Sequence, residues 1–343
     1  MNNYPNNNDF QSPKNSISDM PENPEKTVWV DEKSPEERVL THPLFGEPTI
    51  RTLPSVEAYL ACKNRMLSGV GGFSLLGGRG AGRRGALKVM RAYLSKEFPS
   101  LSVIEYLLPQ SPPSTSCAVL GDLLASAGIS VTGGARSAQF QRLMNMQQER
   151  ALVSGIPRCV VFLYNAEYVN EVVCKTLLDM RDGLLLRGIR LFTVSGALLD
   201  QFKSRVSSLR NRLGDDALGS LFGSVYQLRE LSGVEDYSAV FTEIDTLLTS
   251  GPYPVTWTEA LLPLAYGGGF RLASQTEALH AAVESQTLTG RLSVRSLFGV
   301  VSQVLSLAVH LDAPEFEIPP HVWADAVRVV MGVGAAYLPS PSS

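Results

Sequence analysis

The feature that most constrains this chain is a glycine-rich segment between an apolar stretch and a helical stretch. Residues 71–99 read GGFSLLGGRGAGRRGALKVMRAYLSKEFP. The pattern predicts a short strand over Phe73–Leu76, a glycine turn, and a helix from about Arg83 to Glu97. A strand, a tight loop and a helix in this order are typical of a parallel α/β fold, in which the loop lies at the carboxyl edge of the sheet.

The loop has the spacing G-x-x-x-x-G-K-[ST] of phosphate-binding loops, but its last two positions differ. Arg83 stands where a lysine should reach the phosphates, and Arg84 where a hydroxyl should hold Mg²⁺. A guanidinium has no acceptor, so Arg84 cannot ligate a metal. The glycines can still let backbone N–H groups surround an anion at the start of the helix. The candidate nucleotide- or phosphate-binding residues are Gly77, Gly78, Arg79, Gly80, Ala81, Gly82, Arg83 and Arg84. The alternative is a glycine turn without chemical consequence.

A second substitution concerns the acidic strand that nucleotide hydrolysis needs. That strand should end in an Asp for Mg²⁺ and a Glu for the attacking water. The candidate, residues 160–167, reads VVFLYNAE, so Tyr164 and Asn165 stand in the two acidic positions. Glu167 lies two residues beyond Asn165, where we expect it to be misaligned as a substitute. The four changes together predict that hydrolysis is lost. They argue against Mg²⁺ and weaken the case for ATP, although an anion can still bind.

The rest of the chain continues the alternation of strands and helices. Strands are predicted over 102–108, 158–165 and 189–194, and helices over 54–68, 117–128, 136–154, 169–186 and 197–213. From about residue 232 helices dominate. We therefore predict an α/β P-loop NTPase fold, with a parallel sheet flanked by helices and a smaller C-terminal helical domain. The expected division is a disordered Asn/Pro/Ser-rich tail at 1–25, the α/β domain at 26–231, the helical domain at 232–338 and a short tail at 339–343.

Composition and charge exclude several other classes of protein. The formal net charge is −3, so bulk charge gives no argument for nucleic acid, and any such site must be local. The four cysteines form no C-x-x-C pair, and the scattered histidines suggest no metal site. Disulfides are not expected, which fits a cytoplasmic protein.

No targeting or membrane segment is expected either. The first 25 residues lack the apolar stretch and basic start of a signal peptide. Residues 294–311 are apolar but include Arg295, Gln303 and His310. Their apolar positions recur at helical spacing, which predicts a buried or amphipathic helix rather than a membrane span.

Taken in order, several segments make the chain similar to the TniB/TnsC family of AAA+ transposition regulators, over about residues 40–335. They are HPLF at 42–45, GGRGAGRR at 77–84, VIEYLLPQSPPS at 103–114, LGDLLASAGI at 120–129, VVFLYNAEYV at 160–169, FTVSGALLDQF at 192–202, SSLRNRL at 207–213 and WTEALLPLAYGGGFRLAS at 257–274. The resemblance implies a nucleotide-dependent oligomer on double-stranded DNA that couples a target-selecting protein to a transposase. It also implies degenerate Walker A and Walker B motifs here.

The same resemblance suggests further site residues. FTVSGALLDQF looks like the sensor-1 strand, which makes Ser195 a candidate; Arg210 and Arg212 are arginine-finger candidates, and Arg271 lies near a sensor-2 position. Basic residues after the loop and on the helix at 197–213 are DNA-binding candidates, with a solvated helix face as the alternative. These are Lys88, Arg91, Lys203 and Arg205.

Three functions follow from these patterns. The first is a non-hydrolysing AAA+ adaptor of bacterial DNA transposition, oligomeric and bound to DNA. The second is an active, atypical ATPase in which Arg83 holds the phosphates and Glu167 or Asp122 supplies the metal ligand. The third is a protein-interaction subunit that binds neither nucleotide nor DNA and co-assembles with an active paralogue, to whose site it could lend Arg210 or Arg212.

Overall fold

The structure, a computed structural model, describes residues 33–69, 71–250 and 253–332. The expected tails at 1–25 and 339–343 lie outside these residues. Within the described chain, a parallel sheet of five strands has the order β2-β3-β4-β1-β5. Its strands are β1 Gly72–Gly77, β2 Ser102–Leu107, β3 Arg158–Tyr164, β4 Arg190–Leu198 and β5 Ser224–Gln227.

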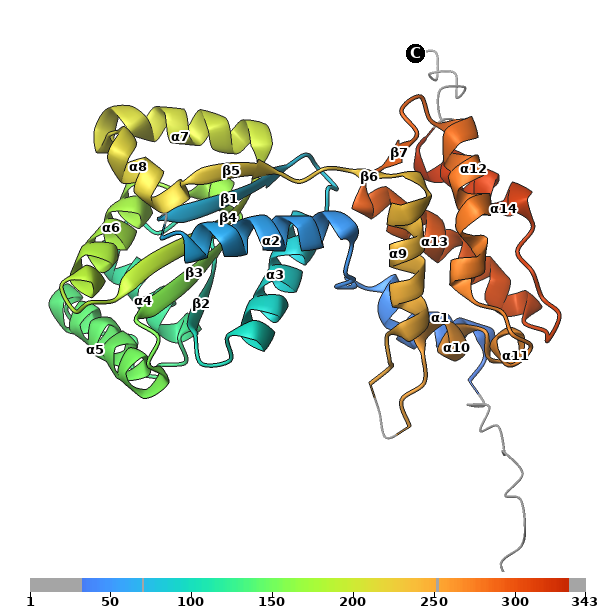
Figure 1. The fold of residues 1–343 in the computed structure, drawn as a ribbon, viewed down its shortest axis with the longest axis horizontal. Coiled ribbons are helices and arrows are strands. Elements are labelled where there is room, and N and C mark those ends of the chain that lie inside the picture. The colour runs from blue at the N-terminus through green and yellow to red at the C-terminus, as the bar shows by residue number, and fades with distance from the viewer. Residues whose placement is uncertain (1–32, 70, 251–252, 333–343) are drawn as a thin grey trace, which may run out of the picture. The chain divides into compact units, whose positions relative to one another are not determined.

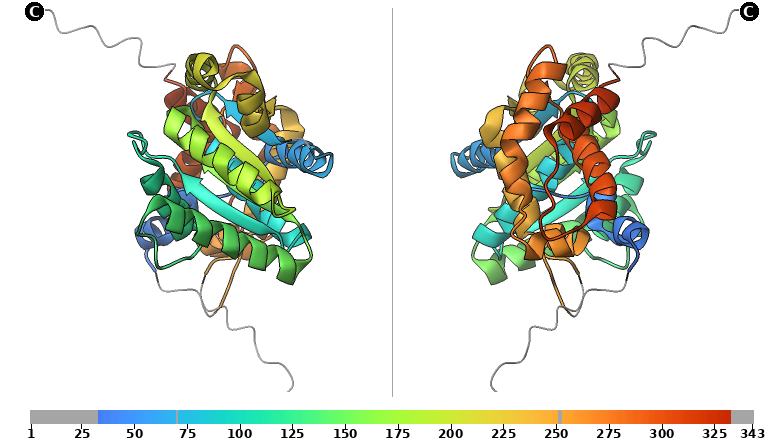
Figure 2. Two further views of the ribbon diagram at one scale, coloured as in Figure 1. Left: turned by 90° about the vertical axis from the view of Figure 1, so that its left-hand side faces the viewer. Right: turned by 90° about the vertical axis from the view of Figure 1, so that its right-hand side faces the viewer.

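Helices connect these strands and cover both faces of the sheet (Figure 1). On one face, α2 and α3 bury side chains such as Tyr59 and Met90 against Phe73 and Phe162. On the other face, α4 to α8 pack around Leu143, Leu177 and Phe202. Figure 2 shows α5 and α6 on the outer side of the sheet. The bounds are α2 Leu53–Leu67, α3 Arg83–Glu97, α4 Ser116–Ser126, α5 Arg136–Ser154, α6 Glu171–Leu185, α7 Leu199–Leu213 and α8 Asp215–Phe222, with a 3₁₀ turn, η2, at Ala166–Tyr168.

The C-terminal part is helical and has its own core. Trp323, Tyr237 and Phe241 are among its largest buried side chains. A two-stranded antiparallel sheet of β6 Leu231–Ser232 and β7 Arg291–Leu292 lies beside them. The helices are α9 Gly233–Thr246, α10 Trp257–Leu261, α11 Pro263–Gly267, α12 Thr276–Gln286, α13 Val294–Ala308 and α14 Pro320–Val330, with 3₁₀ turns η3 Leu272–Gln275 and η4 Val309–Leu311. The predicted fold class, a parallel sheet flanked by helices with a helical C-terminal part, is confirmed.

One apolar helix in the described chain, over Val294–Leu311, is long enough to cross a membrane by length and composition. Its apolar residues, including Leu297, Val301 and Val304, are buried in the helical core. The segment packs inside the protein as the sequence predicts for a buried or amphipathic helix.

Several elements differ from the prediction. The strand predicted at 189–194 extends to Leu198. Helix α8 and strand β5 were not expected, and β5 pairs with β1 at the edge of the sheet. Strands β6 and β7 are also additional; they lie at the start of and within the region where helices were expected to dominate.

The segment before α2 packs on the helical part. Helix α1, Pro35–Thr41, begins at a capping box on Ser34, and η1 spans Pro43–Phe45. Leu44 and Ile50 belong to the core of the C-terminal helices. The segment was expected to belong to the α/β domain of residues 26–231. The division into domains therefore stays a proposal, with this segment on the helical side.

His42 fixes this segment through both ring nitrogens. Nδ1 accepts the N–H of Leu44 at 3.1 Å, and Nε2 lies 3.0 Å from the carbonyl oxygen of Trp257. The ring is 6% exposed. Burial lowers its pKa from 6.5 to about 4, against the opposing effect of the Trp257 carbonyl. The His42 ring is therefore neutral in the folded protein, where Nε2 donates a hydrogen bond and Nδ1 accepts one.

This pKa predicts a pH-dependent stability. Because the folded pKa lies below the unfolded one, the contribution of His42 is complete above pH 6.5. It is lost as pH falls toward about 4, by up to about 1.4 kcal/mol for each pH unit. Urea unfolding between pH 7 and 4.5 should show the stability gap between the protein and His42→Gln narrowing as pH falls. A gap that stays constant would contradict this pKa.

Candidate nucleotide-binding site

The glycine loop lies where the sequence predicts it, between the end of β1 and the start of α3. Gly80 and Gly82 have φ of +79° and +82°, which residues with a Cβ rarely adopt. Helix α3 begins at Arg83, and its N-cap residue, Gly82, provides no side-chain cap; its first turn has no acidic residue. Its first N–H groups and its positive dipole end thus lie at the carboxyl edge of the sheet, an arrangement suited to an anion.

Arg83 folds back onto the loop itself. Its Nη1 donates to the carbonyl oxygens of Gly77 at 2.8 Å and Gly78 at 2.5 Å. Burial lowers the pKa of this guanidinium, and the charge of Glu167 opposes that effect. Arg84 Nη1 lies 3.9 Å from the Glu47 carboxylate, and more than half of the Arg84 side chain is exposed.

Tyr164, at the end of β3, joins a polar chain that the sequence did not reveal. Its hydroxyl donates to Glu105 Oε2 on β2 at 2.8 Å. The other Glu105 oxygen pairs with the Nε of Arg91 on α3. Burial raises the pKa of Tyr164, and Glu105 raises it further. The ring takes the position of the expected metal-binding Asp and stays a neutral donor.

Asn165 is, within the described chain, the only residue other than glycine with a positive φ, +57°. Its Nδ2 donates to the Leu108 carbonyl at 3.3 Å. Asparagine tolerates this left-handed conformation better than most residues. The kink directs the chain into η2 and places Glu167 beneath the loop.

The backbone of Asn165 makes a specific prediction. Replacement by glycine should leave the free energy of unfolding nearly unchanged, because glycine adopts this φ without strain. Replacement by valine should cost about 1–2 kcal/mol. Chemical denaturation of the two variants gives the comparison, and equal stabilities would contradict the left-handed assignment.

Glu167 is closer to the loop than its sequence position suggests. It is 6% exposed, and its Oε2 accepts the N–H of Leu198 at 3.2 Å. Glu167 lines the same cavity as Arg83 and Asn165. That Glu167 is misaligned as a metal ligand stays a prediction.

A cavity of about 430 Å³ lies beside the loop. Helix α13 of the C-terminal part closes one side of it: Arg295 N donates to Gly80 O at 3.0 Å. A Cβ added at Gly82 would lie 2.9 Å from Val294, so only glycine fits under this helix. The lining residues are Glu47, Pro48, Ile50, Thr52, Gly80, Ala81, Gly82, Arg83, Arg84, Gly85, Ala86, Leu87, Tyr164, Asn165, Glu167, Gly196, Leu228, Val294, Arg295 and Phe298. Gly77, Gly78 and Arg79 are not among them.

The residues present fit a nucleotide but not its usual metal. Backbone N–H groups and arginines can hold phosphates, and an apolar wall that includes Ile50, Leu228 and Phe298 can hold a base. Glu47 and Glu167 are the only residues of the lining that could offer a carboxylate to a metal. In the described part of the chain, no group of three or more His, Cys, Asp or Glu side chains could hold a metal ion. No step that depends on Mg²⁺ can be derived from this arrangement.

The other nucleotide-related candidates lie outside the cavity. Ser195 is fully buried in the sheet, with its Oγ 2.8 Å from that of Ser74. Strand alternation turns it away from the loop, while its neighbour Gly196 lines the cavity. Arg271 covers the Tyr266 ring at 3.6 Å and donates to the Tyr266 and Phe270 carbonyls. Arg295, which sequence reasoning missed, lines the cavity, and Arg271 does not.

The basic candidates divide between two helices. On α7, Arg210 pairs with Asp215 at 2.5 Å and Arg212 with Glu171 at 3.0 Å, both with exposed side chains. Lys203 and Arg205 are exposed on the same helix. On α3, Lys88 is exposed, whereas Arg91 is engaged by Glu105.

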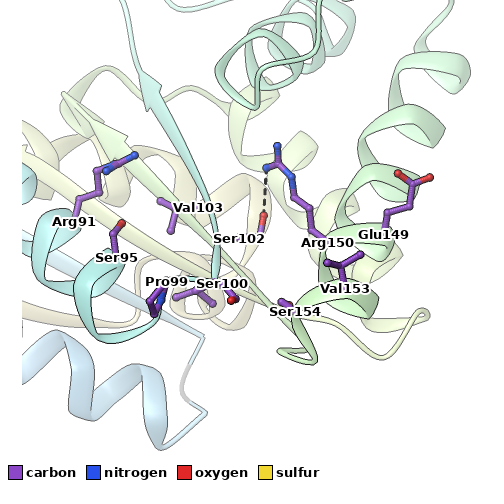
Figure 3. Close-up of a pocket in the computed structure, with 11 residues that line it drawn as sticks. Arg91, Ser95, Pro99, Ser100, Ser102, Val103, Glu149, Arg150, Val153 and Ser154 are labelled. Carbon is purple, nitrogen blue, oxygen red and sulfur yellow. Dashed lines mark hydrogen bonds between the residues drawn. The ribbon is translucent and has the colours of Figure 1, made fainter. Parts of the chain in front are cut away.

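A larger hollow of about 570 Å³ lies at the opposite end of the strands, where β2 begins (Figure 3). Arg91 and Arg150 approach it from α3 and α5, and Arg150 donates to the Ala127 carbonyl at 2.8 Å. Parallel α/β sheets bind ligands at the carboxyl ends of their strands. The cavity at the glycine loop is therefore the candidate site, although it is the smaller of the two.

The four cysteines are all free, as the sequence predicts. Burial raises the pKa of Cys62, Cys159 and Cys174 to about 12, so these thiols are unreactive.

No protein-family model matches the sequence, and no curated protein matches it. Among solved structures, the chain is similar to Drosophila ORC bound to DNA, with 12% identity over 96% of this chain and 74% of that chain and a TM-score of 0.49. It is also similar to Cdc6p from Pyrobaculum aerophilum, with 14% identity over 82% of this chain and 68% of that chain and a TM-score of 0.49. A third similar structure is domain III of the Thermotoga maritima replication initiation protein DnaA, with 13% identity over 83% of this chain and 93% of that chain and a TM-score of 0.39. At these identities and TM-scores, the similarities assign no activity to this chain.

Proposed function

We propose that this protein is an AAA+ regulator of bacterial DNA transposition, similar to the TniB/TnsC family, that does not hydrolyse ATP. It would act in the cytoplasm as an oligomer on double-stranded DNA and bridge a target-selection protein to a transposase. The observation that carries the proposal is the loop: it keeps the strand–loop–helix geometry of a phosphate site while Arg83 binds its carbonyl oxygens. Tyr164 and Asn165 stand in the positions of the two catalytic acids.

The proposed DNA surface is helix α7. Four basic side chains are exposed along its length, against one acidic residue, Asp200, in its first turn. They are Lys203, Arg205, Arg210 and Arg212. Two of them are held only by exposed ion pairs, which cost little to replace by phosphate contacts. The local charge thus supports DNA binding, although the net charge of the chain is −3.

One observation favours the second candidate, an atypical ATPase. Glu167 is buried at the cavity that also contains Arg83, so a carboxylate is available near the loop. Glu167 belongs to no group of three or more His, Cys, Asp or Glu side chains among the described residues, so it makes a weak metal site. The adaptor therefore explains more of the site.

Binding to a labelled DNA duplex, followed by fluorescence anisotropy as salt is raised, tests the proposal. We expect binding at 50 mM salt and a slope of log K against log salt of about −3 to −4, because each phosphate contact contributes about −0.9. A protein that co-purifies with an AAA+ paralogue but does not bind DNA at this salt would contradict the proposal. That result would favour the protein-interaction subunit, with Arg210 and Arg212 exposed toward its partner.

A further inference from the structure

The cavity beside the glycine loop has an excess of positive charge. Three arginines line it, Arg83, Arg84 and Arg295, against two carboxylates, Glu47 and Glu167. The Glu47 side chain is 83% exposed and lies 3.9 Å from Arg84, so it neutralises little. The positive end of α3 adds to this excess, since its first turn contains two arginines and no acid. An anionic ligand would relieve the repulsion.

Arg295 is held at the loop by its backbone rather than by its side chain. Its N–H donates to Gly80 O at 3.0 Å, and the preceding Val294 packs on Gly82. In the described chain, the guanidinium itself has no hydrogen-bond or ion-pair partner and is exposed. The backbone of Arg295 is thus fixed at the glycine loop while its guanidinium is free. A guanidinium held in this way can form charge-assisted hydrogen bonds to a phosphate bound at the loop.

The same cavity is poor in metal ligands. Arg84 replaces the hydroxyl that would hold the metal, and the Tyr164 hydroxyl is engaged by Glu105. Glu167 already accepts the Leu198 N–H. The charge that a divalent cation would neutralise therefore has to be met by the arginines.

The apolar part of the lining selects among anions. Ile50, Leu87, Leu228 and Phe298 give it apolar surface, and the cavity of about 430 Å³ is larger than a phosphate group needs. A ligand with both a polyphosphate and an apolar ring system matches the two sides.

We propose that this cavity binds a nucleoside polyphosphate without a divalent cation, with Arg83, Arg84 and Arg295 supplying the charge. This inference rests on the proposed function, because it takes from it that the glycine loop is a phosphate-binding loop. It adds binding that does not depend on a divalent cation and a role for Arg295. Arg295 acts here as a binding residue that links the ligand to α13.

Isothermal titration of the full chain with ATP, in EDTA and in excess MgCl₂, tests it. We expect ATP to bind in EDTA at least as tightly as in MgCl₂, and more tightly than inorganic tripolyphosphate in both. Arg295→Gln and Arg84→Gln should each weaken binding by about tenfold, the effect of losing one charge-assisted hydrogen bond. Lys96→Gln is the matched control, since Lys96 is exposed on α3 and does not line the cavity.

Binding that requires Mg²⁺, or no binding of ATP in EDTA, would overturn the proposal. Tripolyphosphate binding as tightly as ATP would overturn the assignment of a nucleoside. DNA binding by the same preparation keeps the two proposals apart: DNA binding without ATP binding refutes only this inference. ATP binding in EDTA without DNA binding refutes only the adaptor function.

Discussion

Replacing Arg229 by methionine should lower the free energy of unfolding by about 3 kcal/mol, the lower end of the range for leaving a buried charge unpaired. Arg229 lies between β5 and β6, on the connection from the sheet to the C-terminal helices. It donates to Asp236 of α9 at 2.5 and 3.0 Å and to Glu57 of α2 at 2.7 and 3.0 Å. Asp236 is 2% exposed, and without Arg229 only the Ser232 N–H, at 2.7 Å, would remain beside its carboxylate.

Two matched variants separate this mechanism from general damage. Glu57 is 45% exposed, so Glu57→Gln should cost no more than about 1 kcal/mol. In an Asp236→Asn background, Arg229→Met should cost much less than in the wild type, because no charge is then left buried. Urea denaturation of the wild type, Arg229→Met, Asp236→Asn and the double variant gives the coupling energy between Arg229 and Asp236. An Arg229→Met variant as stable as Glu57→Gln would show that the network does not fix the connection.

Replacing the four basic residues of α7 by glutamine should weaken binding to duplex DNA by roughly ten thousandfold near 0.1 M salt. Each phosphate contact contributes about a factor of ten at this salt, and its loss should reduce the slope of log K against log salt by about 0.9. The fold should survive, since the ion pairs of Arg210 and Arg212 are exposed and contribute at most about 1 kcal/mol each.

The control has the same change in net charge at a different place. Arg65, Lys96, Arg136 and Arg328 are exposed on α2, α3, α5 and α14, away from α7. Their replacement by glutamine should change DNA affinity only through the overall field of the protein, by less than about tenfold at 0.15 M salt. Equal losses in the two quadruple variants would show that α7 is not the DNA surface.

Local sequence predicted the elements around the loop well because several signals agree there. Gly80 and Gly82 break the chain between an apolar strand and a helix with a clear periodicity, and the predicted helix 83–97 matches α3 at both ends. Strand β5 was missed because it has only four residues and none of them is fully buried. Its pairing with β1 joins residues about 150 positions apart, and such a contact leaves no local pattern.

The site itself could be predicted only in part. The loop, Tyr164 and Asn165 follow from motif spacing, but Arg295 reaches the cavity through the packing of α13, far along the chain. The sole local sequence feature near Arg295 is the start of α13 at its N-cap residue, Ser293, whose hydroxyl accepts the N–H of Ser296. Ser195, a sensor candidate by family resemblance, is buried by the alternation of β4 and does not line the cavity. Glu105 could have been noticed as a charge within a strand.

We propose that the phosphate-loop scaffold persists in this protein without ATP hydrolysis. Phosphate release from ATP by the purified protein can be measured with Mg²⁺ and duplex DNA present. We expect no release above the buffer background, and no difference between the protein and its Arg83→Ala variant. Robust Mg²⁺-dependent turnover that Arg83→Ala abolishes would contradict this proposal.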